Sequence, residues 1–124
     1  MIQTVIHSQG VDVSRHSERI IRNQVQRALN RFRSHVRLVS IHIKDVNGPR
    51  GGADTSVIVR TRMRGKIELS ANARRSRLLA ASSSAIRRTR RQVKRAIRRQ
   101  QSFDRMTFGD SNMRQFGARA VAGS

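Results

Sequence analysis

The stretch VRLVSIHIKDVNGPRGGADTSVIVRTRMRGKIELSANA, residues 36–73, decides the fold, because an alternating apolar pattern runs through it and turn residues break it twice. In its first part Val39, Ile41 and Ile43 point one way and the polar residues between them the other, which predicts a half-buried strand over 36–46. The cluster NGPRGG that follows is the strongest turn signal in the chain, since Pro cannot occupy a central ladder and Gly-Gly favours a reversal. A second strand is therefore expected directly after it.

Two further strands complete this part of the chain. Residues 55–64 alternate again, and the residues predicted to face inward are Val57, Val59, Thr61 and Met63. The residues between them face outward, and three of these are Arg60, Arg62 and Arg64. Gly65 supplies a tight reversal into a last strand over 66–73, which completes a hairpin.

The N-terminal part adds one strand and one helix. Residues 2–7 alternate as a short strand before a break at Gly10. Over 15–32 the apolar residues recur at spacings of three, four and seven, which is typical of an amphipathic helix. Ser14 is its expected N-cap, and Glu18 in the first turn complements the helix dipole.

A long basic helix follows the last strand. Residues 76–100 return to helical spacing, and the apolar stripe consists of Leu79, Ser82, Ile86, Val93, Ala96 and Ile97. Residues 101–124 show no sustained period and contain glycine, so a flexible C-terminal tail is expected there. The chain thus divides into a domain over 1–100 and a tail over 101–124.

These elements predict an α+β domain with the order β-α-β-β-β-α. A helix between the first two strands favours a parallel pair with a right-handed crossover, and the short turns favour antiparallel pairs after it. The expected architecture is a four-stranded mixed sheet with two helices packed on one face and the other face open. A chain of 124 residues has no room for a second domain of ordinary size.

The charge of the chain indicates a polyanionic partner. Its 27 basic and 7 acidic residues give a formal net charge of +20, and Arg outnumbers Lys by 24 to 3. Arg grips phosphate through a planar fork of donors, so nucleic acid, and RNA in particular, is the first candidate. There is no Cys to form disulfides, and neither a signal peptide nor a membrane span is recognisable, so a cytoplasmic location is expected.

The basic residues are densest between residues 60 and 99, where fifteen of them accompany a single acid, Glu68. A solvated helix face normally mixes acids with bases, so this bias favours contact with phosphate. The candidate RNA-binding residues are Arg60, Arg62, Arg64, Arg74, Arg75, Arg77, Arg87, Arg88, Arg90, Arg91, Lys94, Arg95, Arg98 and Arg99. Arg74, Arg75 and Arg77 precede the last helix, and cations at a helix N-terminus oppose the helix dipole unless an anion is near.

No catalytic residue, metal site or cofactor is expected. The four histidines, His7, His16, His35 and His42, lack metal-ligand spacing and a companion carboxylate cluster, and His42 is expected to point outward from its strand. The Gly-rich turn is not followed by the Gly-Lys-Ser/Thr of a P-loop. Because Trp and Tyr are absent, no base-stacking platform is expected, and recognition should be of backbone and shape.

Several stretches together resemble one known family. They are the opening Ile2 to His7, the helix end Arg31-Phe32, the strand Val39 to Ile43, the turn Asp45 to Asp54, and Arg62-Met63-Arg64-Gly65 ahead of an apolar strand and a long final helix. Over residues 1–100 the chain resembles the ribosome hibernation promoting factor and ribosome-associated inhibitor family, in its short single-domain type.

The resemblance implies a cytoplasmic protein without catalytic activity that binds the rRNA of the small ribosomal subunit in the mRNA and tRNA channel. It implies that the protein blocks translation and protects idle ribosomes during stress or stationary phase. The RNA-facing surface of the family maps here onto Arg87, Arg88, Arg91, Lys94, Arg95 and Arg98. This chain is richer in arginine than many members, and its tail after Gln101 matches no dimerisation domain, so a monomer is expected.

Other classes of function remain to be separated from this one. The alternative is a structural ribosomal or general RNA-binding protein, which the charge alone and the long Arg-rich helix favour. An enzyme acting on RNA, such as a small nuclease or a peptidyl-tRNA hydrolase, is disfavoured because the sequence lacks a catalytic acid pair, a metal cluster and a Gly-Gly-Gln tripeptide. Neither a membrane nor a small-molecule substrate is an expected partner.

Overall fold

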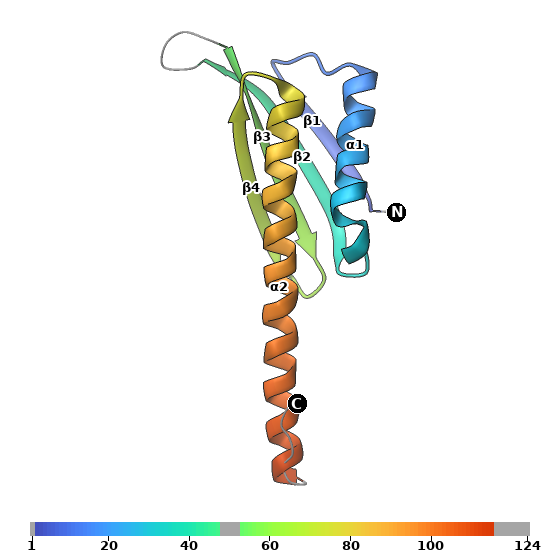
Figure 1. Ribbon diagram of the computed structural model, residues 1–124, viewed down its shortest axis with the longest axis vertical. Coiled ribbons are helices and arrows are strands. Elements are labelled where there is room, and N and C mark those ends of the chain that lie inside the picture. The colour runs from blue at the N-terminus through green and yellow to red at the C-terminus, as the bar shows by residue number, and fades with distance from the viewer. Residues whose placement is uncertain (1, 48–52, 116–124) are drawn as a thin grey trace. The chain divides into compact units, whose positions relative to one another are not determined.

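The computed structural model describes residues 2–47 and 53–115 (Figure 1). Its elements are β1 (Thr4–Gln9), α1 (Arg15–Leu29), the short 3-10 helix η1 (Asn30–Phe32), β2 (Val36–Asn47), β3 (Ala53–Met63), β4 (Glu68–Arg75) and α2 (Leu78–Gln115). The predicted order β-α-β-β-β-α is confirmed. The turn predicted between the second and third strands lies outside the described residues, apart from its first position.

The four strands form one sheet in the order β1-β2-β3-β4. β1 runs parallel to β2, because α1 carries the chain back along the sheet between them, and the two following pairs are antiparallel. The predicted mixed sheet is therefore confirmed, and each strand lies beside its neighbour in sequence.

The hydrophobic core lies between one face of the sheet and the helices. α1 and the part of α2 up to Val93 cover this face (Figure 1). From the strands the core takes Val39, Ile41, Ile43, Val57, Val59, Thr61, Met63, Ala71 and Ala73. α1 adds Ile21, Val25 and Leu29, which have no exposed surface. The strand period of two and the helix period of 3.6 thus meet in one buried layer.

Small residues form much of the covered face of α2. Ala81, Ala85 and Thr89 recur at every fourth position and are fully buried. The Thr89 hydroxyl donates to the Ala85 carbonyl at 3.0 Å, so the helix itself satisfies it. The buried Ser82 hydroxyl donates to Oε1 of Gln24 at 2.7 Å and so joins α2 to α1. The three residues at four-residue spacing were not part of the predicted stripe, because a hydropathy pattern is dominated by large side chains.

The N-terminus of α1 is capped as predicted. The Ser14 side chain accepts a hydrogen bond from the Ser17 backbone N–H at 3.0 Å. Glu18 lies in the first turn and forms an ion pair with Arg22 at 3.3 Å. The helix gives way to η1 at Asn30, so the predicted helix over 15–32 corresponds to two consecutive helical elements.

Side chains of α1 satisfy backbone groups along the outer edge of β1. Nη1 of Arg22 donates to the Thr4 carbonyl at 2.6 Å. The Gln26 amide donates to the Ile2 carbonyl at 2.9 Å and accepts from the Ile2 N–H at 3.3 Å. This edge is therefore occupied by the protein's own helix.

α2 does the same for the other edge strand, β4. Nη1 of Arg88 donates to the Asn72 carbonyl at 2.6 Å, and Nε2 of Gln92 donates to the Ser70 carbonyl at 2.9 Å. In both helices the Arg precedes the Gln by four residues, and the two acceptors are two residues apart, because one helical turn roughly matches a two-residue strand repeat. Unpaired strand edges invite pairing with other chains, and these contacts oppose it.

The loop between β3 and β4 is longer than predicted, so the last strand begins later in the sequence than expected. The Met63 N–H donates to the Ile67 carbonyl at 2.8 Å, so residues 64–66 form the loop, in which Gly65 and Lys66 have φ values of 82° and 63°. Lys66 therefore belongs to the turn, and β4 begins at Glu68 and ends at Arg75. The predicted strand over 66–73 was placed two residues too early.

The chain consists of two compact units, Met1–Val93 and Lys94–Ser124, and α2 contributes residues to both. α2 ends at Gln115 rather than at the predicted Gln100, because a helix once nucleated propagates through residues that lack an apolar stripe. Residues 116–124 of the predicted tail lie outside the described residues. The flexibility of the tail stays a prediction.

Candidate nucleic-acid interface

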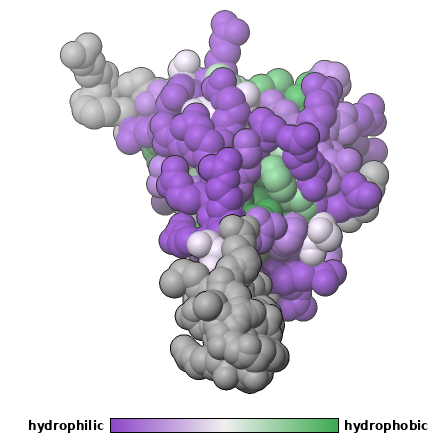
Figure 2. Space-filling view, turned by 60° about the horizontal axis from the view of Figure 1, so that its bottom comes forward, coloured by the Kyte–Doolittle hydropathy of each residue, from purple (hydrophilic) through white to green (hydrophobic). Residues whose placement is uncertain are grey.

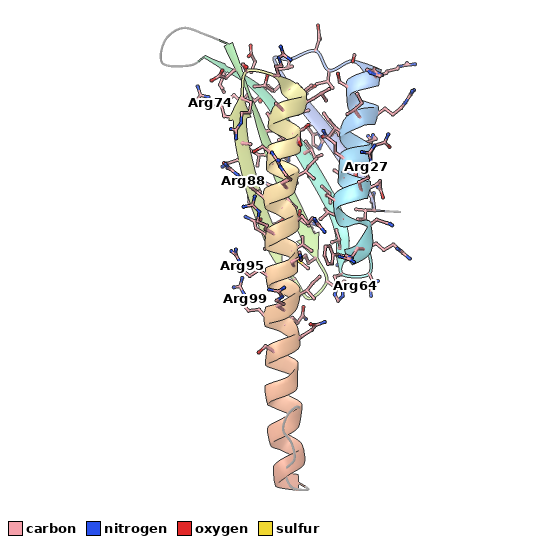
Figure 3. The ribbon with its side chains drawn as sticks, viewed as in Figure 1. Arg27, Arg64, Arg74, Arg88, Arg95 and Arg99 are labelled. Atoms are coloured by element: carbon pink, nitrogen blue, oxygen red, sulfur yellow. The ribbon has the colours of Figure 1, made fainter. Side chains whose placement is uncertain are left out.

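Two of the three arginines predicted on one sheet face lie there. Arg60 and Arg62 are exposed on β3, on the face opposite the helices, which we call the open face. Arg64 instead lies in the turn, since β3 ends at Met63. Figure 3 labels Arg64 at the end of the sheet where the chain passes from β3 to β4. The prediction that Arg64 continues the strand row is wrong.

Acidic residues pair with two arginines of the open face. Nε of Arg62 lies 3.4 Å from Oε2 of Glu68, and Nε of Arg74 lies 3.3 Å from Oδ2 of Asp54. Both pairs are solvent-exposed, so each contributes little to stability. Their main effect is local neutralisation, which leaves Arg60 as the arginine of this face without an acid among the described residues.

Arg74, Arg75 and Arg77 do not form one cluster at the start of α2. Arg74 and Arg75 are the last residues of β4, and Arg77 immediately precedes α2. Arg75 donates to the Arg74 carbonyl at 2.8 Å and to the Ser84 hydroxyl at 3.2 Å. Arg77 is exposed, and its carbonyl accepts from the Ala81 N–H at 3.0 Å, which closes the first helical turn.

Within the first unit, α2 carries four exposed arginines, namely Arg87, Arg88, Arg90 and Arg91. Arg88 points toward β4 and is anchored on the Asn72 carbonyl, whereas the other three have no hydrogen-bond or ion-pair partner among the described residues (Figure 3). Arg87, Arg90 and Arg91 share one helix face, because residues three and four apart are neighbours. Their guanidinium groups are free to bind anions.

The second unit begins with the remaining candidates. Arg95, Arg98 and Arg99 are exposed, whereas Lys94 is half-buried. Arg95 and Arg99 project from the helix in Figure 3. Like charges three and four residues apart destabilise an isolated helix, so a bound anion would relieve this segment.

The sequence analysis missed a second basic helix face. The exposed arginines of α1 and of the residues directly after it are Arg15, Arg19, Arg27, Arg31 and Arg33. Hydrophilic residues cover most of the face seen in Figure 2. These arginines can be read from the sequence, but the number of basic residues per length is highest over residues 60–99. In α1, Glu18 and the apolar residues of the stripe make the basic residues less frequent, so they were not selected.

Histidines form an unexpected feature of the open face. His7 of β1 and His42 of β2 are register partners, and their rings stack with centroids 5.1 Å apart and an interplanar angle of 19°. Burial lowers the pKa of His42, and the nearby His7 and Arg60 lower it further. The outward direction predicted for His42 is confirmed, and the expectation that the protein recognises RNA by backbone and shape stays a prediction.

A shallow depression surrounds this histidine pair. Its volume is about 610 Å³, and its lining comes from β1, β2 and β3 and includes His7, His42, Lys44, Ile58 and Arg60. It therefore combines aromatic rings with two cations.

The described residues contain no group of three or more His, Cys, Asp or Glu side chains that could hold a metal ion. Among the described helices, none is long and apolar enough to cross a membrane. The chemistry that the exposed surfaces offer is hydrogen bonding and charge pairing with anions. Phosphate suits it best, because guanidinium forks bind phosphate bidentately.

The fold and the basic surfaces define a small α+β domain suited to polyanion binding, and comparisons with solved structures agree on the fold. The chain is similar to a ribosomal subunit interface protein from Coxiella burnetii, with 16% identity, a TM-score of 0.60, and coverage of 77% of this chain and 97% of that chain. It is similar also to the N-terminal domain of Protein Y from Thermus thermophilus, with 14% identity, a TM-score of 0.60, and coverage of 76% and 96%. No protein-family model matches the sequence, and no curated protein matches it. The likeness therefore concerns the fold.

Proposed function

We propose that this protein is a ribosome-associated translation inhibitor that binds rRNA of the small subunit in the mRNA and tRNA channel during stress or stationary phase. The observation that carries the proposal is the exposed arginine face of α2, Arg87, Arg90 and Arg91, which has no acidic partner among the described residues. It occurs on a fold shared with a protein described as a ribosomal subunit interface protein.

The distribution of charge supports an enclosed RNA site over a flat one. Exposed arginines lie on α1, on α2 and on the open face of the sheet, so cations point in several directions from the first unit. A channel lined with phosphate can contact all of these surfaces, whereas one duplex can contact only one side at a time. Binding should release counterions and should depend strongly on salt.

The proposal includes no catalysis and no cofactor. It treats the arginines of α2 as the principal contacts, together with Lys94, Arg95, Arg98 and Arg99 of the second unit, and it keeps residues 1–100 as the binding domain and 101–124 as a tail. Arg75 and Arg88 have a structural part as well, because each donates hydrogen bonds within the protein. The protein would act in the cytoplasm as a monomer.

Density-gradient fractionation of growing and starved cells tests the proposal. We expect the protein with small subunits and idle ribosomes from starved cells, and we expect the purified protein to inhibit translation initiation. Stoichiometric presence on translating polysomes would instead favour a structural ribosomal protein. Equal affinity for duplex DNA and for ribosomes would favour a general nucleic-acid binder, and the proposal would then be wrong.

A further inference from the structure

We propose that the open face of the sheet is a separate binding site for single-stranded RNA, in which a base stacks on the His7–His42 pair while Lys44 and Arg60 hold the flanking phosphates. The inference takes its class of ligand from the proposed function, but it concerns a surface that the arginines of α2 do not form. The proposed function uses the open face only as a source of positive charge and does not require a base to stack there.

The strand register places the platform and the cations in adjacent rows. His7, His42 and Ile58 are partners across three neighbouring strands and form one row of the open face. With strands about 4.8 Å apart, this row spans roughly 10 Å, and all three side chains line the depression described above. Because the two imidazole rings already face each other, a base that enters the depression extends their stack rather than lying flat across both rings.

Cations lie on both sides of this row. In the row on one side, Arg60 is the register partner of Ser40, and in the row on the other side, Lys44 is the register partner of Ser56. The other residues of these two rows are Val5, Gln9 and Ser70, which are uncharged, and Arg74, which lies opposite Ser56. A strand of RNA that runs parallel to the β-strands, and so crosses the three rows, would therefore meet a positive group before and after the stacked base.

The acids of the open face are placed where they do not neutralise these two cations. Among the described strand residues, the acids that share this face are Glu68 and Asp54, and they pair with Arg62 and Arg74. Lys44 and Arg60 are both exposed and have no ion-pair partner in the described part of the chain. The centre of the face is therefore positive, while its ends are locally neutral.

The same groups couple the site to pH. The charged groups that face His42 are His7 on β1, Lys44 on β2 and Arg60 on β3, with the Arg62–Glu68 and Arg74–Asp54 pairs farther out; the helices lie on the opposite face of the sheet. Burial and positive neighbours hold the pKa of His42 below its ordinary value of 6.5. A bound phosphate would stabilise the imidazolium and raise that pKa, so binding takes up a proton and strengthens as the pH falls.

A single strand fits these groups better than a duplex or an acidic peptide. In a duplex the bases are paired and stacked, so none can lie on the imidazoles without being flipped out. An acidic peptide could satisfy the cations, but its carboxylates would leave the stacked rings without a partner. Aromatic rings flanked by cations are the usual features of single-strand binding surfaces.

The test measures binding of the full-length protein to a labelled six-nucleotide uridine RNA at several salt concentrations and pH values. The double variant His7→Thr/His42→Thr keeps β-branched residues in the strands and should bind about tenfold more weakly. Arg60→Gln should reduce the salt slope by about 0.7. His16→Ala, at an exposed position of α1, serves as the matched control and should leave binding to the hexamer unchanged.

A second measurement needs no variant. NMR titration of the wild-type protein should show the pKa of His42 rise in the presence of the hexamer, and the hexamer should shift the ring resonances of His7 and His42 but not those of His16. Inorganic tripolyphosphate and a hexaglutamate peptide serve as comparison ligands without bases. Equal binding of either ligand, or an unchanged affinity of the double threonine variant, would overturn the stacking site.

The outcomes separate this inference from the proposed function. If the double threonine variant loses the hexamer but still co-sediments with small subunits, both proposals stand on their own surfaces. If the wild-type protein binds the hexamer through the histidines but never associates with ribosomes, the proposed function fails and the open-face site stands. If ribosome association persists while the hexamer does not perturb the histidines, the open-face site is refuted alone.

Discussion

Replacing Arg87, Arg90 and Arg91 together by Gln should weaken binding to the small ribosomal subunit without unfolding the protein. The three side chains are exposed, share one face of α2 and make no hydrogen bond or ion pair among the described residues, so the fold loses no polar contact there. Gln has a helix propensity close to that of Arg, and removing three like charges should relieve repulsion along the helix. Arg88 is left intact because it is anchored on the Asn72 carbonyl.

The expected magnitude follows from counterion release. Each lost phosphate contact lowers the slope of log K against log salt by about 0.7 to 0.9, so three contacts lower it by roughly 2 to 3. If the electrostatic contribution is taken to vanish near 1 M salt, the same three contacts account for about a 100-fold difference in affinity at 0.15 M salt. The difference should shrink steadily as the salt concentration rises.

These values are tested by measuring how labelled protein binds purified small subunits at about five salt concentrations between roughly 0.05 and 0.5 M. In this range a plot of log K against log salt is expected to be linear. The matched control is the triple substitution of Arg15, Arg19 and Arg27 by Gln on α1, which removes the same net charge from exposed helical positions. Circular dichroism of both variants verifies that the fold is retained.

Two results would refute the reasoning. An unchanged salt slope in the α2 variant would mean that this face does not contact phosphate. An equal loss in the α1 control would mean that affinity follows total charge, so that α2 has no special position in the interface.

Four further predictions concern stability and the core. Thr61→Val should stabilise the protein by about 1 kcal/mol in urea denaturation, because the buried Thr61 hydroxyl has no protein partner among the described residues; a loss of stability would show that the hydroxyl is satisfied. Ser14→Ala should cost about 1 kcal/mol by the same assay through loss of the N-cap, and no cost would contradict the cap. Ile86→Asp should abolish the cooperative thermal transition, since it buries an unpaired charge at a position that is 3% exposed; a retained transition would place Ile86 outside the core. Stability should fall as the pH drops below about 6.5, because the lowered pKa of His42 means that the unfolded chain binds more protons, and this fall should be smaller in His42→Gln.

Local patterns were sufficient to predict the elements and their pairing. The alternation in β2 and β3 and the turn residues between strands specify hairpins, and the stripe of α1 with Ser14 ahead of it specifies a capped helix. These patterns depend only on residues close in sequence, so they can be interpreted without knowledge of the tertiary structure. The boundary errors at Lys66 and Gln100 arose where a turn conformation and helix propagation extend beyond the apolar pattern.

The sequence predicted which residues make up the candidate interface, but it did not predict which of their side chains have partners within the protein. Density of arginine selected α2 correctly as an exposed basic helix, yet it could not separate Arg88, which satisfies the edge of β4, from Arg87, which has no partner among the described residues. It also could not separate Arg62, paired with Glu68, from Arg60. Such distinctions depend on which strand or helix lies opposite each side chain.

The sequence by itself determined the class of fold, the buried faces and the high positive charge on which the proposal of a polyanionic partner rests, because periodicity and net charge are properties of the chain. Only the tertiary structure decided that His7 and His42, 35 positions apart in the sequence, stack on one face, and that the neighbouring Lys44 and Arg60 have no ion-pair partner among the described residues. The physical reason is that register between strands is a long-range property. It brings β1 beside β2 through a crossover helix, and no local pattern encodes which residues then become partners.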